Sequence, residues 1–171
     1  GLSAVAVDGG YSHAMVLRRD GSVASFGSEP AVPASVTNVV AISAGYSRSA
    51  AVLVDSSVVT WGSASMAPAV VSNAVQVAVG FGFAASLRDD GVVTAWGITD
   101  LRAPAPPLQN MVSIACGMNH GLALRNDGRV FAWGNNNSGQ RNVPGDLTNA
   151  IAIAAMGDWS LALRSDGRVV A

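Results

Sequence analysis

VSIACGMNHGLALRNDGRVFAWGNNNSGQ, residues 112–140, is the stretch of sequence that decides the fold. It contains a short apolar run, a glycine turn, a second apolar run, an Asn-Asp-Gly turn and a third run that ends in Trp-Gly. Short runs of this kind, rich in Val, Ile and aromatic residues and bounded by glycine, are typical of β-strands. The stretch therefore predicts a meander of three strands.

The same pattern occurs five times along the chain. An aspartate of the second turn recurs in steps of 35, 35, 37 and 39 residues, at Asp20, Asp55, Asp90, Asp127 and Asp166. An aromatic-glycine pair ends the third run in the first four copies, with its aromatic residue at Phe26, Trp61, Trp96 and Trp133. Units of this length cannot bury their own apolar faces, so they must pack against neighbouring units.

No segment shows helical periodicity, so we expect an all-β fold, with the units packed radially as blades of a β-propeller. The chain forms a single repeat domain, 1–171, with blades of about 35–39 residues. Four full units, 1–38, 39–74, 75–111 and 112–150, precede a partial unit, 151–171. The period alone also allows a stacked sandwich or a β-solenoid.

The composition of the chain limits the kinds of molecule that it is expected to bind. Half of the residues are apolar and 12% are charged, as expected for a chain that buries most of its sheet faces. The ten basic residues are scattered and the net charge is −1, so the basic stripe needed for nucleic acid is absent. The longest uncharged stretch, 56–87, is interrupted by Gly and Pro, and we expect no membrane insertion. No signal peptide is visible, and the localisation stays open.

The fourth copy resembles the regulator of chromosome condensation repeat, written loosely as AxGxxHxLAL, DGxV and WGxNxxGQ. The resemblance is carried by GMNHGLAL (117–124), DGRV (127–130) and WGNNNSGQ (133–140). The short units are similar to the compact bacterial-type repeats of the propeller β-lactamase inhibitor protein. The resemblance implies a seven-bladed propeller that holds a partner protein on one face. Two features of this chain depart from the pattern. Phe26 stands where the other copies have tryptophan, and the first three copies lack the loop that residues 135–140 form in the fourth.

The first turn of each copy holds a triplet that differs between copies: YSH (11–13), YSR (46–48), FGF (81–83), MNH (118–120) and GDW (157–159). Residues that only pack should be alike in every blade, whereas these are aromatic residues, Arg and Met, the types that anchor interfaces. We therefore predict a ring of partner-binding residues, formed by Tyr11, His13, Tyr46, Arg48, Phe81, Phe83, Met118, His120, Asp158 and Trp159. The alternative is that each packs on the next blade.

The other recurrent residues predict structure. The tryptophans before glycine are expected to fill the space between blades. The aspartates belong to isolated turns without the spaced oxygen ligands of a calcium loop, so we expect no metal and no cofactor. Cys116 lies in an apolar run and is predicted to be a buried thiol. Asn136 begins a glycosylation sequon, and its modification stays open.

No nucleophile, base and orienting acid cluster in the sequence, so we expect no enzyme. The predicted function is a protein–protein interaction scaffold that binds a partner protein through one face of the propeller. Three alternatives are a secreted enzyme inhibitor, a nucleotide-exchange factor for a small GTPase and a carbohydrate-binding propeller.

The number of units predicts open ends. Seven blades would need about 260 residues at this period. We expect the first and last units each to expose an apolar flank, which further blades of the same chain or another subunit would cover.

Overall fold

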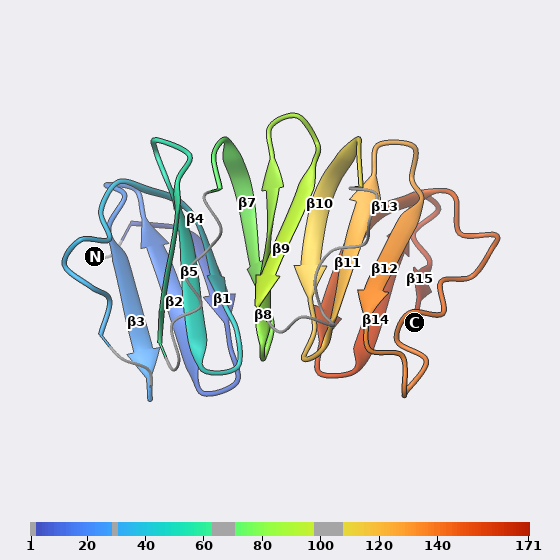
Figure 1. Cartoon of the computed structure of the whole chain (residues 1–171), viewed down its shortest axis with the longest axis horizontal. Helices are drawn as coiled ribbons and strands as arrows, with labels where there is room; N and C mark the ends of the chain where they lie inside the picture. Colours follow the sequence, from blue (N-terminus) through green and yellow to red (C-terminus); the bar gives the residue numbers. More distant parts are fainter. Residues whose placement is uncertain (1–2, 29–30, 63–70, 98–107) are drawn as a thin grey trace.

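The structure of the chain is a computed structural model that describes residues 3–28, 31–62, 71–97 and 108–171. These residues form five antiparallel sheets of three strands, each in sequence order. The sheets stand side by side as blades, from the blue first blade to the red fifth blade (Figure 1). The described residues contain no helix, so the all-β prediction is confirmed.

The strands of the five blades have similar lengths. Blade one contains β1 (Ala4–Gly9), β2 (His13–Arg18) and β3 (Val23–Gly27), and blade two contains β4 (Val39–Ala44), β5 (Arg48–Leu53) and β6 (Val58–Gly62). Blade three contains β7 (Ala74–Val79), β8 (Phe83–Arg88) and β9 (Val93–Gly97), and blade four contains β10 (Met111–Cys116), β11 (His120–Arg125) and β12 (Val130–Gly134). Blade five contains β13 (Ala150–Met156), β14 (Trp159–Arg164) and the two-residue β15 (Val169–Val170).

Asparagine residues fix where the first strands of three blades begin. Asn38, Asn73 and Asn110 adopt φ values of 54°, 60° and 61°, and each directly precedes a first strand. Asn tolerates this left-handed conformation better than most residues, and the extended strand begins immediately after it. As a result, β7 and β10 begin one residue before the predicted unit starts of 75 and 112.

The second turns are not the two-residue type I′ turns that an Asp-Gly pair often forms in hairpins. In blade one, the Gly21 amide donates to the Arg18 carbonyl (3.0 Å) and the Arg18 amide donates to the Ser22 carbonyl (2.9 Å). Gly21 has φ +77°, but Asp20 is not among the described residues with positive φ. A type I′ turn needs positive φ at both central residues, so this turn has a single left-handed residue. In blade two that position is Ser56, with φ +64°.

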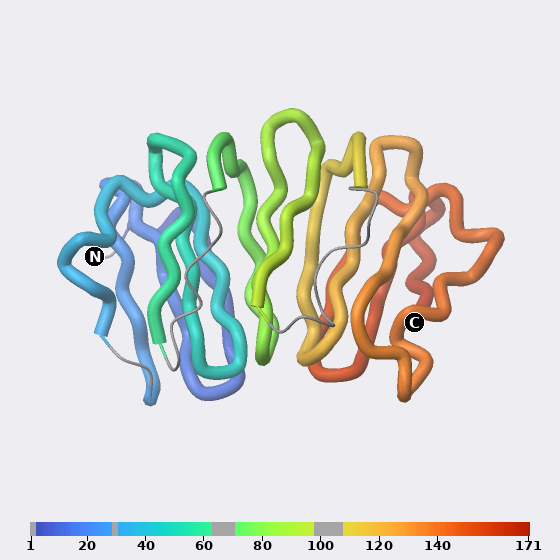
Figure 2. The backbone as a smooth tube through the Cα atoms, viewed as in Figure 1, coloured from blue at the N-terminus to red at the C-terminus, as the bar shows by residue number. Residues whose placement is uncertain are grey.

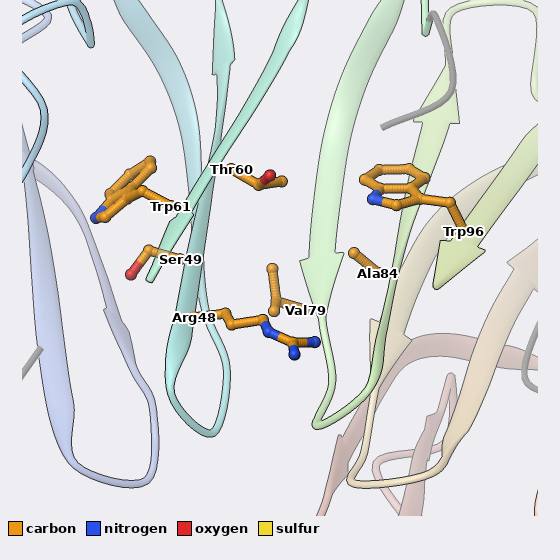
Figure 3. A pocket seen from close by; sticks show the side chains of 7 residues that line it. All are labelled: Arg48, Ser49, Thr60, Trp61, Val79, Ala84 and Trp96. Atoms are coloured by element: carbon orange, nitrogen blue, oxygen red, sulfur yellow. The ribbon is translucent and has the colours of Figure 1, made fainter. Parts of the chain in front are cut away.

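The tryptophans pack each blade on the one before it. Trp61, Trp96 and Trp133 are at least 93% buried. Trp61 packs with Met15 and Leu17 of blade one. Trp96 and Trp133 occupy the equivalent places on blades two and three, and Figure 3 shows Trp61 and Trp96 on the same side of their own blades. The prediction for these residues is confirmed.

Polar side chains add cross-links between the first strands. Ala44 N donates to Asp8 Oδ2 (2.7 Å), and Val79 N donates to Ser43 Oγ (3.1 Å). The Gln76 side chain donates to and accepts from the backbone of Ile114, at 3.0 Å each. Because the first strands of neighbouring blades also contact one another, they form the inner wall of the arc.

The two outer blades expose apolar flanks, as the unit count predicted. The first flank consists of Val5, Val7 and Phe26, which are between 54% and 73% exposed. The last flank consists of Met156, Trp159, Leu161 and Val169, which are between 41% and 77% exposed. Phe26 occupies the column of the buried tryptophans, and its exposure follows because no described blade precedes blade one.

The second turns of blades three and four carry short ion pairs. Asp90 and Asp127 lie 2.7 and 2.5 Å from the guanidinium groups of Arg88 and Arg125. The hydrogen bond from Arg125 lowers the pKa of Asp127 to about 2. The described residues include no cluster of three or more His, Cys, Asp or Glu side chains suited to a metal ion. Nor do they include a helix with the length and apolar character of a membrane span.

Candidate functional site: an aromatic strip along the first turns

The first turns of the blades line up along one edge of the molecule, the lower edge in Figures 1 and 2. Tyr11, Tyr46 and Phe81 hold the same position in the turns of the first three blades. The Tyr11 and Tyr46 rings stack at 4.3 Å between centroids, and the Tyr46 and Phe81 rings meet edge to face at 5.0 Å. We call these three residues the aromatic strip.

The strip is accessible at the surface. Tyr11 is 76% exposed and Phe81 is 43% exposed, while Tyr46 between them is half-buried. Aromatic rings have few rotatable bonds and here support one another, so they present apolar area at a low cost in conformational entropy. Anchor residues of protein interfaces have this character.

Backbone hydrogen bonds join the turns of neighbouring blades. Tyr11 N donates to Gly45 O (3.1 Å), Phe81 N to Met118 O (2.9 Å) and Met118 N to Gly157 O (2.7 Å). Arg48 Nη1 adds a bond to Phe81 O at 3.1 Å. Because these amides already have partners, the turns can recognise a partner through their side chains rather than by adding a strand.

Three of the predicted binding residues are in the interior. His13, Phe83 and His120 are 5%, 0% and 0% exposed, so the prediction that they contact a partner directly does not agree with the structure. Each begins a second strand and faces the next blade. His13 Nε2 lies 2.8 Å from Ser49 Oγ of blade two, and Phe83 belongs to the core between blades three and four.

The glycine that ends each first strand makes room for these rings. A Cβ atom at Gly10, Gly80 or Gly117 would overlap the ring of the buried residue three positions later. The repeated glycine is therefore required for His13, Phe83 and His120 to pack inside. This glycine, three positions before each of them, is the feature of the sequence that indicates their burial.

The remaining predicted residues divide between two places. Arg48 and Met118 are half-buried and adjoin the strip through Phe81. Asp158 is exposed and accepts a hydrogen bond from Gln140 Nε2 (3.1 Å). Trp159 stands in the same column as the buried rings, but it is 74% exposed and belongs to the last flank.

His120 and Ser160 form a pair whose hydrogen bonding does not suit nucleophilic catalysis. Ser160 Oγ donates its only proton to Gln140 O (2.7 Å), so His120 Nε2, 2.9 Å away, must be the donor to Ser160 Oγ. A histidine that activates a serine has to accept its proton. Desolvation lowers the pKa of His120, which keeps the ring neutral in this contact between blades.

The sequence pattern did not indicate that the loop after β12 connects blade four to blade five. Gln140 is 5% exposed and links the loop to blade five through Ser160 and Asp158. The Asn136 side chain accepts from Arg141 N (2.8 Å) and donates to Asn142 Oδ1 (3.0 Å). A glycan on Asn136 Nδ2 would have to displace that second bond. Cys116 is partly buried against the core, and desolvation raises the pKa of its thiol.

Comparisons with known proteins agree with the repeat and the fold. A family model described as the regulator of chromosome condensation (RCC1) repeat matches residues 111–140. No curated protein matches the chain. The ectodomain of the receptor kinase CR4 from Physcomitrella patens superimposes with a TM-score of 0.80 at 22% identity, covering 96% of this chain and 50% of that one.

Two further solved structures share the fold. Prp20p from Saccharomyces cerevisiae matches with a TM-score of 0.73 at 18% identity, covering 94% of this chain and 56% of that one. Human WBSCR16 matches with a TM-score of 0.71 at 22% identity, covering 95% and 58%. The chain spans between 50% and 58% of the length of these three structures. The chain thus has a β-propeller fold similar to that of these structures, and its residues 111–140 match the regulator of chromosome condensation repeat.

Proposed function

We propose that the chain is a non-catalytic interaction module that binds a partner protein through the aromatic strip. The observation that carries the proposal is the contiguous, exposed stack of Tyr11, Tyr46 and Phe81 on one edge. Arg48 and Met118 border the stack and complete the surface offered to the partner. Asp158 extends the same edge towards blade five.

The protein class of the partner is supported by the chemistry of the strip and by structural relatives. Prp20p has been studied for its binding to Gsp1p and histones, and it has been crystallised with Kap60 bound. The rings of the strip stack on one another, which reduces the open ring faces that a sugar would need. A protein loop or helix with apolar side chains fits this surface better than a carbohydrate does.

The enzyme inhibitor is the second candidate, because an aromatic cluster can fill the pocket of an enzyme. The three rings of the strip come together and are exposed, whereas Phe83 is buried and Trp159 lies on the last flank. A partner that proves to be an enzyme and loses activity on binding would favour this candidate.

The test is an affinity pull-down from the source cells with the wild-type chain and two variants. Tyr11→Ala combined with Phe81→Ala should remove a specific partner, weakening binding by about 2 kcal/mol or more. Val54→Ala is the matched control, because Val54 is 69% exposed but lies in a second turn on the opposite edge. Retention of every specific partner by the strip variant would contradict the proposal.

A further inference from the structure

The junction between blades two and three is packed differently from the other three junctions of the described blades. At those three, the residue that begins the second strand is a buried ring, His13, Phe83 or His120. Blade two has Arg48 in this place, and Arg48 is only half-buried. Its side chain extends towards blade three (Figure 3), where Nη1 donates to Phe81 O at 3.1 Å.

The space that a ring fills at the other junctions is only partly filled here. A Cβ atom at Gly45 would come nearest to Val79 of blade three, at 2.6 Å, and not to the side chain of Arg48. A cavity of about 10 Å³ remains beside Val79, lined also by Thr60 and Trp96. One water molecule needs about this volume. Blades two and three each contact a described blade on both sides, so the cavity belongs to the interior of the arc.

The hydrogen bond from Arg48 joins two turns of the aromatic strip. Arg48 shares a turn with Tyr46, and the carbonyl that it binds belongs to Phe81, whose ring meets Tyr46. The Phe81 amide donates to Met118 O (2.9 Å), so both backbone groups of Phe81 have partners on neighbouring blades. The carbonyl of Tyr46 is held in the same way, because it accepts from Ser12 Oγ at 3.4 Å. The turn of the preceding blade thus holds the second and third residues of the strip.

We propose that Arg48 is the positioning residue of the aromatic strip, and that the junction of blades two and three gives up packing for this role. The inference rests on the proposed function, in which the strip binds the partner. A guanidinium brings no packing advantage where the other junctions place a ring, and such local departures from good packing are typical of functional sites. Arg48 acts through Phe81: it fixes the contact of that ring with Tyr46, so that the strip is ordered before the partner binds.

The test measures ring contacts and thermal unfolding of the 171-residue chain. Arg48→Met removes the donor, and its flexible side chain can enter the gap beside Val79. We expect NMR to show loss of the contacts between the Tyr46 and Phe81 rings, while the core contacts of Phe83 persist. The chain has two tyrosines and four phenylalanines, so these few ring signals can be assigned. The midpoint of thermal unfolding should rise, or stay within about 2 °C of the wild type.

Two further variants serve as controls. Arg48→Lys should restore the ring contacts, because its ammonium group can still donate to Phe81 O. Arg19→Met should change neither readout, since Arg19 is exposed in a second turn on the opposite edge. Unchanged contacts between Tyr46 and Phe81 in Arg48→Met would overturn the proposal. A midpoint lower by more than about 2 °C would also overturn it, because the contacts would then be lost together with the packing of the junction.

The pull-down distinguishes a failure of this inference from a failure of the proposed function. Arg48→Met should lose the same specific partner as the strip variant. If the strip variant loses that partner and Arg48→Met keeps it, the positioning role is overturned and the proposed function stands. If the strip variant keeps every partner, the proposed function is overturned, while the ring contacts still decide the role of Arg48.

Discussion

Two residues of the same turn, only two positions apart, have opposite environments. Phe81 belongs to the exposed strip, while Phe83 begins β8 and is fully buried against blade four. The turn directs its first side chain outward, and the strand that follows directs its first side chain to the next blade. Residue type alone does not separate the two roles, because aromatic side chains serve both cores and interfaces.

This contrast gives a matched pair of substitutions. Phe83→Ala should lower the free energy of unfolding by about 3 to 5 kcal/mol, because it leaves a cavity in the core. Phe81→Ala should cost less than about 1.5 kcal/mol, because its ring is already partly in water. Urea unfolding of both variants measures the difference. Similar losses would mean that Phe81 is also a packing residue.

The buried histidine of blade four predicts a pH dependence of stability. Burial lowers the pKa of His120 in the folded chain, so the unfolded chain binds the proton more strongly. Stability should therefore fall as the pH drops below about 6.5, the ordinary histidine pKa, and the loss is complete at the lower folded pKa. Urea unfolding between pH 8 and pH 5.5 measures the effect.

The control for this prediction is His120→Phe, because Phe83 occupies the same column in blade three. The variant should show a smaller decrease in stability over the same pH range. An unchanged pH profile in His120→Phe would assign the dependence to another group.

At the scale of elements, the strands could be predicted from the sequence because the apolar runs and the spacing of glycines repeat five times. The turn type could not, since Asp-Gly fits both a type I′ turn and a turn with one left-handed glycine. The burial of His13 and His120 depends on Ser49 and Ser160, which lie 36 and 40 residues further along the chain. Such pairs become visible only when the blades are placed side by side.

The second turn of blade two contains a strained residue, and replacing that residue should stabilise the chain. Ser56 holds φ +64°, where the other four blades have glycine. Ser56→Gly should raise the free energy of unfolding by about 0.5 to 1 kcal/mol, because it removes the strain of a left-handed non-glycine residue. Thermal unfolding measures the gain. Ser57→Gly is the control and should destabilise the turn, because it removes the hydrogen bond that Ser57 Oγ donates to Asp55.

At the scale of the whole molecule, the first and last of the described blades each expose an apolar flank. Each blade contacts its neighbours in sequence, and the same columns that are buried at the inner junctions are exposed at the two ends. Leu161 of blade five is 41% exposed, whereas its counterpart Leu122 in blade four is 2% exposed. Substitutions at Leu161 and Leu122 can therefore be compared to find out whether the last flank is covered.

A charged substitution at each position distinguishes the two states of the flank. Leu122→Glu should cost about 3 to 5 kcal/mol, since it buries an uncompensated charge. Leu161→Glu should change the free energy of unfolding by no more than about 0.5 kcal/mol, as surface substitutions do. Unfolding experiments at two protein concentrations make the measurement. A large loss in Leu161→Glu would show that another molecule or segment covers the flank.

The direction in which the tryptophans pack has a consequence for how the chain is made. Trp61, Trp96 and Trp133 each reach back to a blade that lies earlier in the sequence. On the ribosome, that earlier blade has already emerged when the tryptophan is added, since synthesis runs from the N-terminus. Each new meander can thus dock as soon as its third strand leaves the exit tunnel, and the propeller grows one blade at a time during translation.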